Sequence, residues 1–501
     1  MGRRARSSQV FVPLFLVSLM LGGGWLSSRA SGQASTLDKS ACTRWLATGG
    51  ADGNPGDRAG PWMTLQHAAE SIRPGDTLCV AAGTYPIKDG LDLTVSGTPE
   101  APITLTTLGA PVTLHGGVRL TKGVSHVRLQ GFAVTGFSTW GITVDGESAD
   151  VVLSDLTVTG GEAGIHLTAG DSGQPPEYGP VRNITIEHST VSGAAYTAVD
   201  CTPGPCDELT LRRLEVYGSG AATGFAGDGI AVERGSNLVV EDCFVHDNGG
   251  DGIDLNSRDV GAKMPGIVVR RNRVVGNGRN GIKVWAGGTV ENNVIANSGS
   301  TALVLESGTY HVVNNTVASI SSYDYLAMLG NYDNQYPVEL HLYNNIFYND
   351  NAQMGGTLAF FPRLVTLHAG HNLYYNPFRE EEVICADNLG QDACFGKQAI
   401  NSGIWNSGSL QSEQSLYADP AFVSPASGDF RLTAESPAVR LPNRCGSGDL
   451  LSEAEPGFEF DQHLGRTSLS PAREAGRLYV PPARSAQYSP AIARHSVLLH
   501  R

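Results

Sequence analysis

Long apolar runs, aromatic residues and positive charge are all scarce in this chain of 501 residues. Aromatic side chains make up 7% of it, and no apolar stretch after Leu21 is long enough to cross a membrane. The formal net charge is -14, which excludes a general nucleic-acid binder because such proteins present a basic surface to phosphates. An anionic ligand would therefore need a local basic patch or a bound cation.

Cysteine is sparse as well, and its eight residues do not make a chain of this length a disulfide scaffold. We expect disulfides to link the local pairs and leave the remaining two thiols as candidates for free cysteine. The expected pairs are Cys42 with Cys79, Cys201 with Cys206 and Cys385 with Cys394, and the remaining thiols are Cys243 and Cys445.

The N-terminus has the pattern of an export signal. Three arginines precede an apolar run from Val10 to Leu21, and small residues follow through Ala34. Residues 1–34 are therefore expected to be a signal peptide, and the mature protein to be secreted or periplasmic with no membrane span. An uncleaved anchor is the alternative.

Glycine, in contrast, is abundant, with 62 residues, and it recurs at the ends of the segments of a repeated unit. Segments such as "LVVEDCFVHDNG" from Leu238 and "IVVRRNRVVGNG" from Ile267 recur every 22 to 33 residues. Each unit tends to be followed by a second short strand opened by Gly-Ile, as in "DGIDL" and "NGIKV". This pattern is typical of a solenoid with one coil per repeat.

The period-2 alternation of Val and Ile excludes helical repeats, and the signature of leucine-rich repeats is absent. We therefore predict an all-β right-handed parallel β-helix of about ten coils. We expect residues 35–120 to form an N-terminal cap, with a helix around Thr64–Ile72, and the first coils. The β-helix core with an active-site groove is expected in residues 121–380. C-terminal coils and a cap should follow in residues 381–450, and a loosely ordered tail in residues 451–501.

Asparagine recurs at equivalent turns of the coils. Asn292, Asn314 and Asn344 each open an Asn-Asn pair, and Asn272 falls in the same column. Stacked asparagines satisfy one another's amides, so we interpret this column as a structural ladder without chemistry.

Equivalent positions on successive coils stand about 4.8 Å apart, so a column of the repeat is a row on one face. After each Gly of the Gly-Ile pair, the next residue is expected to point inward and the one after it outward. The first outward row reads Thr143, His166, Asp200, Ala231, Asp254, Lys283, Val304. The second outward row reads Asp145, Thr168, Thr202, Glu233, Asn256, Trp285, Glu306.

Carboxylates converge on two adjacent coils. Asp228 and Asp251 precede the glycine, Asp254 lies in the first outward row, and Glu233 is nearby. Such a group would repel itself unless a cation sat among its members. Ligands that are all oxygen atoms and lie in turns favour Ca²⁺. The alternative is that these aspartates only stabilise turns, because Asp beside Gly is common there.

Lys283 stands over Asp254 one coil further on, either as a surface ion pair or as a general base beside a cation. Between Arg258 and Lys283 there are seven basic residues and one acid, although Arg270 and Arg271 are expected on another face. Arg258 and Arg279 are candidates for contacting a substrate carboxylate.

Two residues of the second outward row are further candidates for binding substrate. Trp285 would offer an aromatic surface to a sugar ring or lie at the edge of the core, and Asn256 precedes it in the row.

The segments "GDGIAV" from Gly227, "GDGIDL" from Gly250 and "NGIKV" from Asn280, with the N-terminal stretch from Gly49, resemble the family 9 polysaccharide lyases. These are pectate lyases built on a ten-coil parallel β-helix, and the resemblance spans roughly Ser40 to Ala438. It implies that Asp228, Asp251 and Asp254 bind calcium and that Lys283 is the base. The family has two consecutive aspartates where this chain has Gly250 and Asp251, which leaves Glu233, Asp200 or water to complete the shell.

The resemblance implies β-elimination in a galacturonan. Separately, we expect the protein to be a monomer. Ca²⁺ pairs with the uronate carboxylate and acidifies the C5 hydrogen, neutral Lys283 removes that proton, and the C4–O bond breaks. A calcium ion would also let an acidic protein hold an acidic polymer.

Other functions remain open on the sequence. A lyase acting on alginate or another uronate polymer would look the same, because every such substrate offers a carboxylate beside an acidic proton. A non-catalytic β-helix that binds carbohydrate or a cell surface is a further alternative, because fold does not fix function. A glycoside hydrolase would need paired acids that the rows do not supply.

Overall fold

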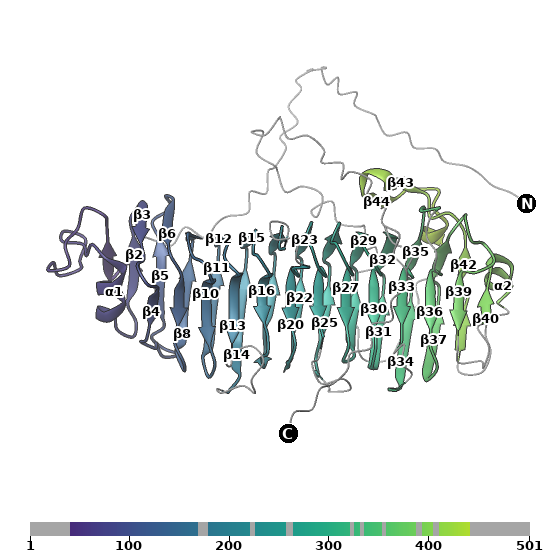
Figure 1. Cartoon of the computed structure of the whole chain (residues 1–501), viewed down its shortest axis with the longest axis horizontal. Helices are drawn as coiled ribbons and strands as arrows, with labels where there is room; N and C mark the ends of the chain where they lie inside the picture. The colour runs from purple at the N-terminus through teal and green to yellow at the C-terminus, as the bar shows by residue number, and fades with distance from the viewer. Residues whose placement is uncertain are drawn as a thin grey trace, which may run out of the picture.

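The computed structural model describes residues 41–168, 179–220, 226–256, 264–320, 325–330, 335–352, 357–386, 393–403 and 410–440. Three long sheets run side by side along one axis, and each coil contributes one strand to each sheet (Figure 1). The predicted parallel β-helix is therefore the fold. The expected signal peptide, the C-terminal tail, Arg258 and Cys445 lie outside the described residues.

Sheet A is the longest of the three, with β17 (Cys206–Asp207) and β21 (Gly235–Ser236) attached beside its main path. Its strands pair in parallel from coil to coil. In order they are β1 (Arg44–Leu46), β2 (Thr77–Val80), β5 (Ile103–Thr107), β8 (Ser125–Gln130), β11 (Ala149–Ser154), β14 (Val181–Glu187), β18 (Thr210–Arg212), β22 (Val239–Glu241), β25 (Val268–Arg270), β28 (Gly288–Glu291), β31 (Gly308–Val313), β34 (Val338–Tyr343), β37 (Val365–Gly370) and β41 (Leu410–Glu413).

Sheet B follows sheet A in each coil after a short turn. Its strands are β3 (Gly83–Pro86), β6 (Val112–His115), β9 (Ala133–Thr135), β12 (Thr157–Thr159), β15 (Thr190–Ser192), β19 (Glu215–Tyr217), β23 (Phe244–His246), β26 (Arg273–Val275), β29 (Val294–Ser298), β32 (Thr316–Ile320), β35 (Ile346–Tyr348), β38 (Leu373–Tyr375) and β42 (Leu416–Tyr417).

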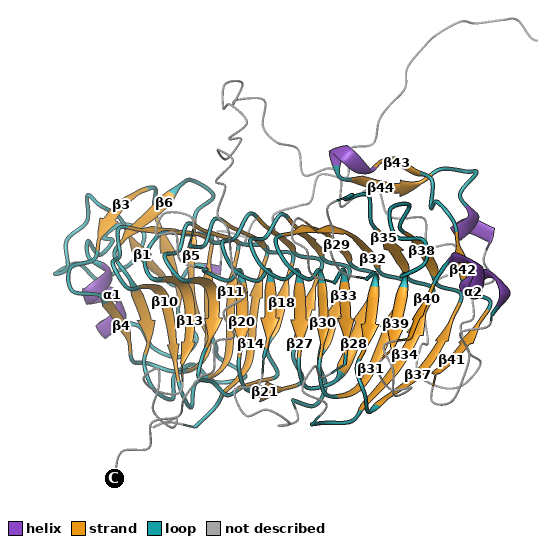
Figure 2. Cartoon of the chain, turned by 45° about the vertical axis from the view of Figure 1, so that its right-hand side comes forward, coloured by secondary structure: helices purple, strands orange, loops and turns teal. Residues whose placement is uncertain are grey.

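Sheet C completes each coil and carries the rows predicted to face outward. Its strands are β4 (Leu91–Leu93), β7 (Val118–Leu120), β10 (Trp140–Asp145), β13 (Ala163–Thr168), β16 (Thr197–Cys201), β20 (Ile230–Val232), β24 (Ile253–Leu255), β27 (Ile282–Val284), β30 (Leu303–Leu305), β33 (Ala327–Leu329), β36 (Ala359–Phe361), β39 (Ile384–Ala386) and β40 (Ala393–Phe395). Figure 2 shows these strands stacked side by side along the axis.

The interior is a continuous stack of aliphatic side chains. On sheet C the register pairs Ile142 with Ile165, Ile230 with Ile253, and Ile253 with Ile282. All of these side chains are fully buried. The predicted inward column is thus confirmed, and it fixes which residues of the same strands face outward.

Asparagines form a buried ladder, but it is not the column predicted above. The ladder consists of the second Asn of each pair together with two single asparagines, and the side-chain amide of each member donates to the next at 3.0 Å. Its members are Asn272, Asn293, Asn315, Asn345 and Asn372.

The first residues of these pairs serve the turn instead. Asn292, Asn314 and Asn344 have φ values of 56°, 57° and 58°. Asn tolerates this left-handed backbone better than most residues. The prediction was therefore wrong by one position for these three residues and right for Asn272.

Both ends of the solenoid are covered. At the N-terminal end, the helix expected around Thr64–Ile72 is α1 (Leu65–Ser71), which lies against the first coils. Thr64 caps it by accepting a hydrogen bond from the His67 N–H. At the other end, β40 pairs with β39 in the antiparallel sense and is followed by α2 (Lys397–Ser402) (Figure 1).

A small antiparallel hairpin packs beside the last coils. It consists of β43 (Phe422–Ser424) and β44 (Asp429–Leu432), which flank the short 3₁₀ helix η2 (Pro425–Ser427). A second 3₁₀ helix, η3 (Pro437–Arg440), follows it. Within the part of the chain described, no helix is long and apolar enough to cross a membrane.

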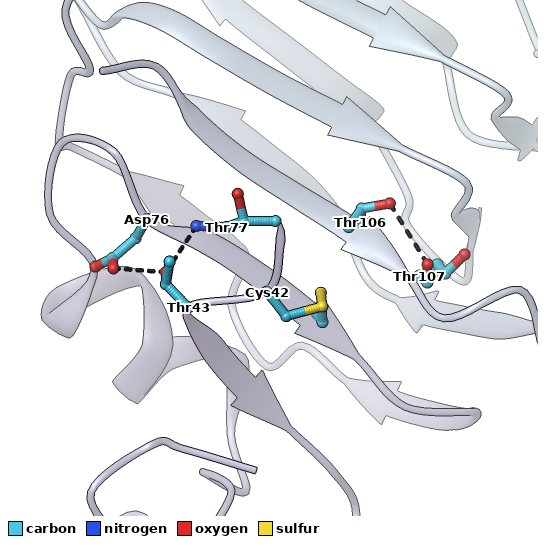
Figure 3. The surroundings of a disulfide bond; sticks show 7 residues. Cys42, Thr43, Asp76, Thr77, Thr106 and Thr107 are labelled. Atoms are coloured by element: carbon cyan, nitrogen blue, oxygen red, sulfur yellow. Dashed lines mark hydrogen bonds between the residues drawn. A yellow bond between two sulfur atoms is a disulfide. The ribbon is translucent and has the colours of Figure 1, made fainter. Parts of the chain in front are cut away.

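The three expected disulfides are all present, and Cys243 is a buried free thiol. The Cys42–Cys79 bond ties the segment before β1 to β2. Beside it, the Thr43 hydroxyl donates to Asp76 at 2.8 Å and accepts the Thr77 N–H at 2.9 Å (Figure 3). The covalent link and these two hydrogen bonds fasten the N-terminal segment to the first coil.

Candidate functional site

Three neighbouring strands of sheet C, β20, β24 and β27, carry the predicted aspartate and lysine row. The register places Ala231 opposite Asp254, and Asp254 opposite Lys283. Since the flanking Ile253 and Ile282 point into the core, Asp254 and Lys283 emerge together on the outer face one coil apart.

Lys283 joins two of the aspartates. Its Nζ lies 3.0 Å from Asp254 Oδ2 and 3.3 Å from Asp251 Oδ2. The same ammonium stands 4.8 Å from the centre of the Trp285 ring, a cation–π distance. Lys283 is therefore held between two carboxylates and an aromatic face.

Asp251 organises the turn that precedes the row. Its Oδ1 accepts both the backbone and the side-chain N–H of Asn280 at 2.9 Å. Its own backbone N–H donates to Asp228 Oδ1 at 2.7 Å. Through these bonds the three residues before the glycines on successive coils form one connected set.

Gly250 lies where the family resemblance expects another aspartate. A Cβ at this position would stand 2.2 Å from Asp228 Oδ1 and 2.9 Å from the Ala226 carbonyl oxygen. Any larger residue would have to displace the Asp228 carboxylate. Glycine is thus required by the way that Asp228 reaches across to Asp251.

The cluster holds three carboxylates and one ammonium, and their electrostatics reflect this imbalance. Burial, reinforced by the neighbouring Asp251 carboxylate, raises the pKa of Asp228 to about 6. Burial also raises the pKa of Asp254 to about 7; Lys283 opposes this shift, whereas Asp251 and Asp228 add to it. Both carboxyl groups are therefore short of positive charge.

Lys283 responds in the opposite way. Burial on its own lowers the pKa of Lys283, but the carboxylates of Asp254 and Asp251 outweigh burial and raise that pKa above its ordinary value. In this arrangement the lysine is a firmly charged ammonium.

Three buried polar atoms at the cluster lack a hydrogen-bond partner among the described residues. They are Asp254 Oδ1, Asn256 Oδ1 and Trp285 Nε1. Buried polar atoms are nearly always bonded, and exceptions cluster where a ligand, an ion or water completes the set. The cluster thus has the unused bonding capacity of a binding site.

The donor set suits a hard cation in its chemistry. It offers carboxylate and amide oxygens, the ligands of Ca²⁺, and it is short of positive charge. In the described ranges, however, no three His, Cys, Asp or Glu side chains are grouped closely enough to hold a metal. The positive charge between Asp251 and Asp254 is that of Lys283, so a metal would have to replace this ammonium.

The other predicted residues are placed as follows. Glu233 follows β20, and the contacts that join the aspartates to Lys283 do not involve it. Arg279 is exposed and its charge acts on Asp228. Arg258 lies outside the described residues.

Two of the seven basic residues do face elsewhere, as expected. Arg270 and Arg271 are paired with Glu241 on sheet A at 2.8 Å. They take no part in the cluster, and the local excess of positive charge in the sequence is divided between faces.

Asp200 is engaged away from the cluster. Its Oδ2 lies 2.7 Å from His166 Nδ1, and its Oδ1 accepts the Thr202 hydroxyl at 2.7 Å. Both of these bonds of Asp200 are therefore to residues outside the cluster. His166 and Asp200 were visible as neighbours in the first outward row, but their pairing was not predicted.

Comparisons with known proteins give the following. A family model described as "Right handed beta helix region" matches residues 140–317, which agrees with the fold described above. The uncharacterized protein YwoF of Bacillus subtilis (strain 168) is 23% identical over 458 residues, covering 79% of this chain and 91% of the relative.

Two solved structures are also similar. The pectate lyase Pel9A is 15% identical with a TM-score of 0.45, covering 79% of this chain and 90% of that one. The A-module of the mannuronan C-5 epimerase AlgE4 of Azotobacter vinelandii is 14% identical with a TM-score of 0.45, covering 71% and 90%. At these values, what either protein acts on does not transfer to this chain.

Proposed function

We propose that the protein is a secreted, calcium-dependent polysaccharide lyase that cleaves a polygalacturonate-type polyuronate by β-elimination. The observation that carries the proposal is the placement of Lys283, one coil beyond Asp254 and between Asp254, Asp251 and the Trp285 ring. An amine beside carboxylates that are short of positive charge has the elements of a base next to a cation site.

The residues of the cluster have separate roles in this proposal. Asp228, Asp251 and Asp254 would hold Ca²⁺, which when bound supplies charge that neutralises the uronate carboxylate and acidifies the C5 hydrogen. Lys283, once uncharged, takes the C5 proton. The electrons of the C5–H bond form a C4–C5 double bond, and the C4–O bond breaks with its electron pair left on oxygen.

The surrounding residues would position the sugar. Trp285 offers a ring beside Lys283, and Asn256 Oδ1 is a buried acceptor without a partner among the described residues, which a hydroxyl of the bound sugar would satisfy. Arg279 is exposed near Asp228 and supplies positive charge for a uronate carboxylate.

Secretion is supported by the three disulfides, because such bonds persist in oxidising compartments. The expected signal peptide over residues 1–34 supports it independently. We expect the mature protein to act as a monomer.

The proposed reaction is tested by incubating the purified protein with polygalacturonate, with and without Ca²⁺, and following the ultraviolet absorbance of the unsaturated product. We expect absorbance to develop only with Ca²⁺ and to develop faster at alkaline pH, because the raised pKa of Lys283 keeps the base charged at neutral pH. Alginate is assayed in parallel to separate a lyase for another uronate.

A non-catalytic carbohydrate-binding protein is the second candidate, and one observation favours it. Lys283 is engaged in two ion pairs, an arrangement that would serve structure as well as chemistry. Polymer binding without any unsaturated product, from neutral to alkaline pH, would establish this candidate and reject the lyase.

The raised pKa values of the carboxyl groups predict an unusual pH dependence of stability without metal. An Asp whose pKa is higher in the folded protein than its ordinary 3.8 loses stability as pH rises from that value through the folded pKa. For Asp254 this window ends at about 7. The free energy of unfolding in chelator should therefore be larger at about pH 5 than at about pH 8.

Asp254→Asn should reduce that pH difference, because the amide does not titrate. Ca²⁺ should stabilise the wild-type protein at the higher pH and stabilise the variant less. Urea unfolding with chelator or with Ca²⁺ measures both effects. A variant that keeps the full pH difference would show that Asp254 is not its source.

A further inference from the structure

A second set of polar and aromatic residues lies on the outer face of sheet C, nearer to the N-terminus than the aspartate cluster. The register pairs His166 with Asp200, Asp200 with Ala231 and Ala231 with Asp254. His166 is thus in the same row as Asp254 and three coils before it, which places the two about 14 Å apart. Figure 1 shows β13, β16, β20 and β27 in this order along the axis.

His166 is held by a buried carboxylate. The Nδ1–Oδ2 distance to Asp200 is 2.7 Å, and the Thr202 hydroxyl donates to the other carboxylate oxygen. The two residues are 6% and 9% exposed. This chain of bonds fixes the imidazole and directs its Nε2 away from Asp200, and no described residue bonds to that nitrogen.

Trp140 lies flat against the same imidazole. The ring centres are 4.6 Å apart and the planes differ by 14°. The imidazole covers one face of the indole. Trp140 is nevertheless 38% exposed, a large fraction for an indole already stacked on one side.

An open aromatic face beside a fixed polar nitrogen is a combination suited to a sugar ring. The electron-rich face of an indole attracts the C–H groups of a pyranose, and one well-placed polar atom fixes the orientation of the ligand. Asp200 and Thr202 already position His166 without a ligand, so little freedom is lost when a sugar hydroxyl donates a hydrogen bond to Nε2.

We propose that Trp140 and His166, supported by Asp200, form a second carbohydrate-binding subsite for the polymer that reaches Lys283. This inference rests on the proposed function and extends it from one reacting bond to a chain lying along the axis. Only the small side chain of Ala231 stands between Asp200 and Asp254 in the row, so no bulky group of the row separates the two sites.

The test measures binding rather than turnover, in gels cast with polygalacturonate, with neutral xylan or without polymer. Trp140→Ala should weaken retention by polygalacturonate about tenfold. His166→Asn keeps a donor toward Asp200 but removes Nε2, and it should weaken retention by a smaller factor. The control is Phe378→Ala, which removes an aromatic side chain that is 52% exposed after β38 and should leave retention unchanged.

Ligand length separates a subsite from a general loss of structure. A short uronate disaccharide is too small to reach both sites, so its affinity for the lysine cluster should be the same in Trp140→Ala and wild type. Equal polymer retention by these two proteins would overturn the subsite and leave the proposed function standing. Retention by xylan alone, lost in Trp140→Ala, would keep the subsite and reject the uronate lyase, and no retention by either polymer would reject both.

Discussion

Replacement of Lys283 by alanine should lower the turnover of polygalacturonate at least about 100-fold, because proton transfer by a positioned base commonly contributes that much or more. The change removes the amine that stands between Asp254 and Asp251. Initial rates at saturating substrate and Ca²⁺, measured from the product's absorbance, give the effect directly.

Two further variants separate the loss of a base from the loss of a charge. Lys283→Arg keeps a cation near both carboxylates, but the guanidinium stays protonated and cannot accept the C5 proton, so this variant should be nearly as inactive as the alanine variant. Lys397→Ala is the matched control, since Lys397 also pairs with a carboxylate, Glu380 at 3.1 Å, and lies over an aromatic ring, Tyr417. Turnover retained in Lys283→Ala would remove this residue from the mechanism.

Replacement of Asn315 by leucine should destabilise the fold by about 3–5 kcal/mol, among the larger effects expected of one substitution. Its amide donates to Asn345 and to the Val290 carbonyl, and its oxygen accepts two bonds from Asn293. Leucine makes none of these bonds and leaves several buried partners unsatisfied. Chemical unfolding followed by circular dichroism measures the loss.

The adjacent residue provides a control within the same turn. Asn314 has a left-handed backbone with φ of 57°, which glycine adopts without strain. Asn314→Gly should therefore change stability by well under the amount expected for Asn315→Leu. Similar losses in the two variants would argue against the ladder as the main contribution of these asparagines.

The asparagine pairs show where prediction from the sequence stops. The alternation of apolar residues identified the coils, and the glycine column identified the inward isoleucines. Both could be predicted because a shift of one residue in the register would move the apolar side chains out of the core. Two consecutive asparagines at a turn carry no apolar signal. Which of the two is buried depends on which residue of the turn adopts the left-handed backbone conformation. The repeat pattern does not encode that choice.

The candidate site shows the same division. The row containing Asp254 and Lys283 followed from the periodicity alone, whereas their contacts depend on side chains that reach between coils. The need for glycine at 250 arises from Asp228 Oδ1 one coil away, and the pairing of His166 with Asp200 and Trp140 is likewise an interaction between coils. The sequence pattern of one coil locates such residues but does not show which side chains of the adjacent coils they contact.

The unbroken register of sheet C from β7 to β36 has a consequence for how specificity can change. Each outward residue has a fixed position along the axis, and equivalent residues on successive coils are one interstrand spacing of about 4.8 Å apart. Moving a stacking residue to another coil therefore changes its distance from the reactive amine in multiples of this spacing. A substitution moves a contact by one coil or leaves it in place, so ligand length is sampled in discrete increments.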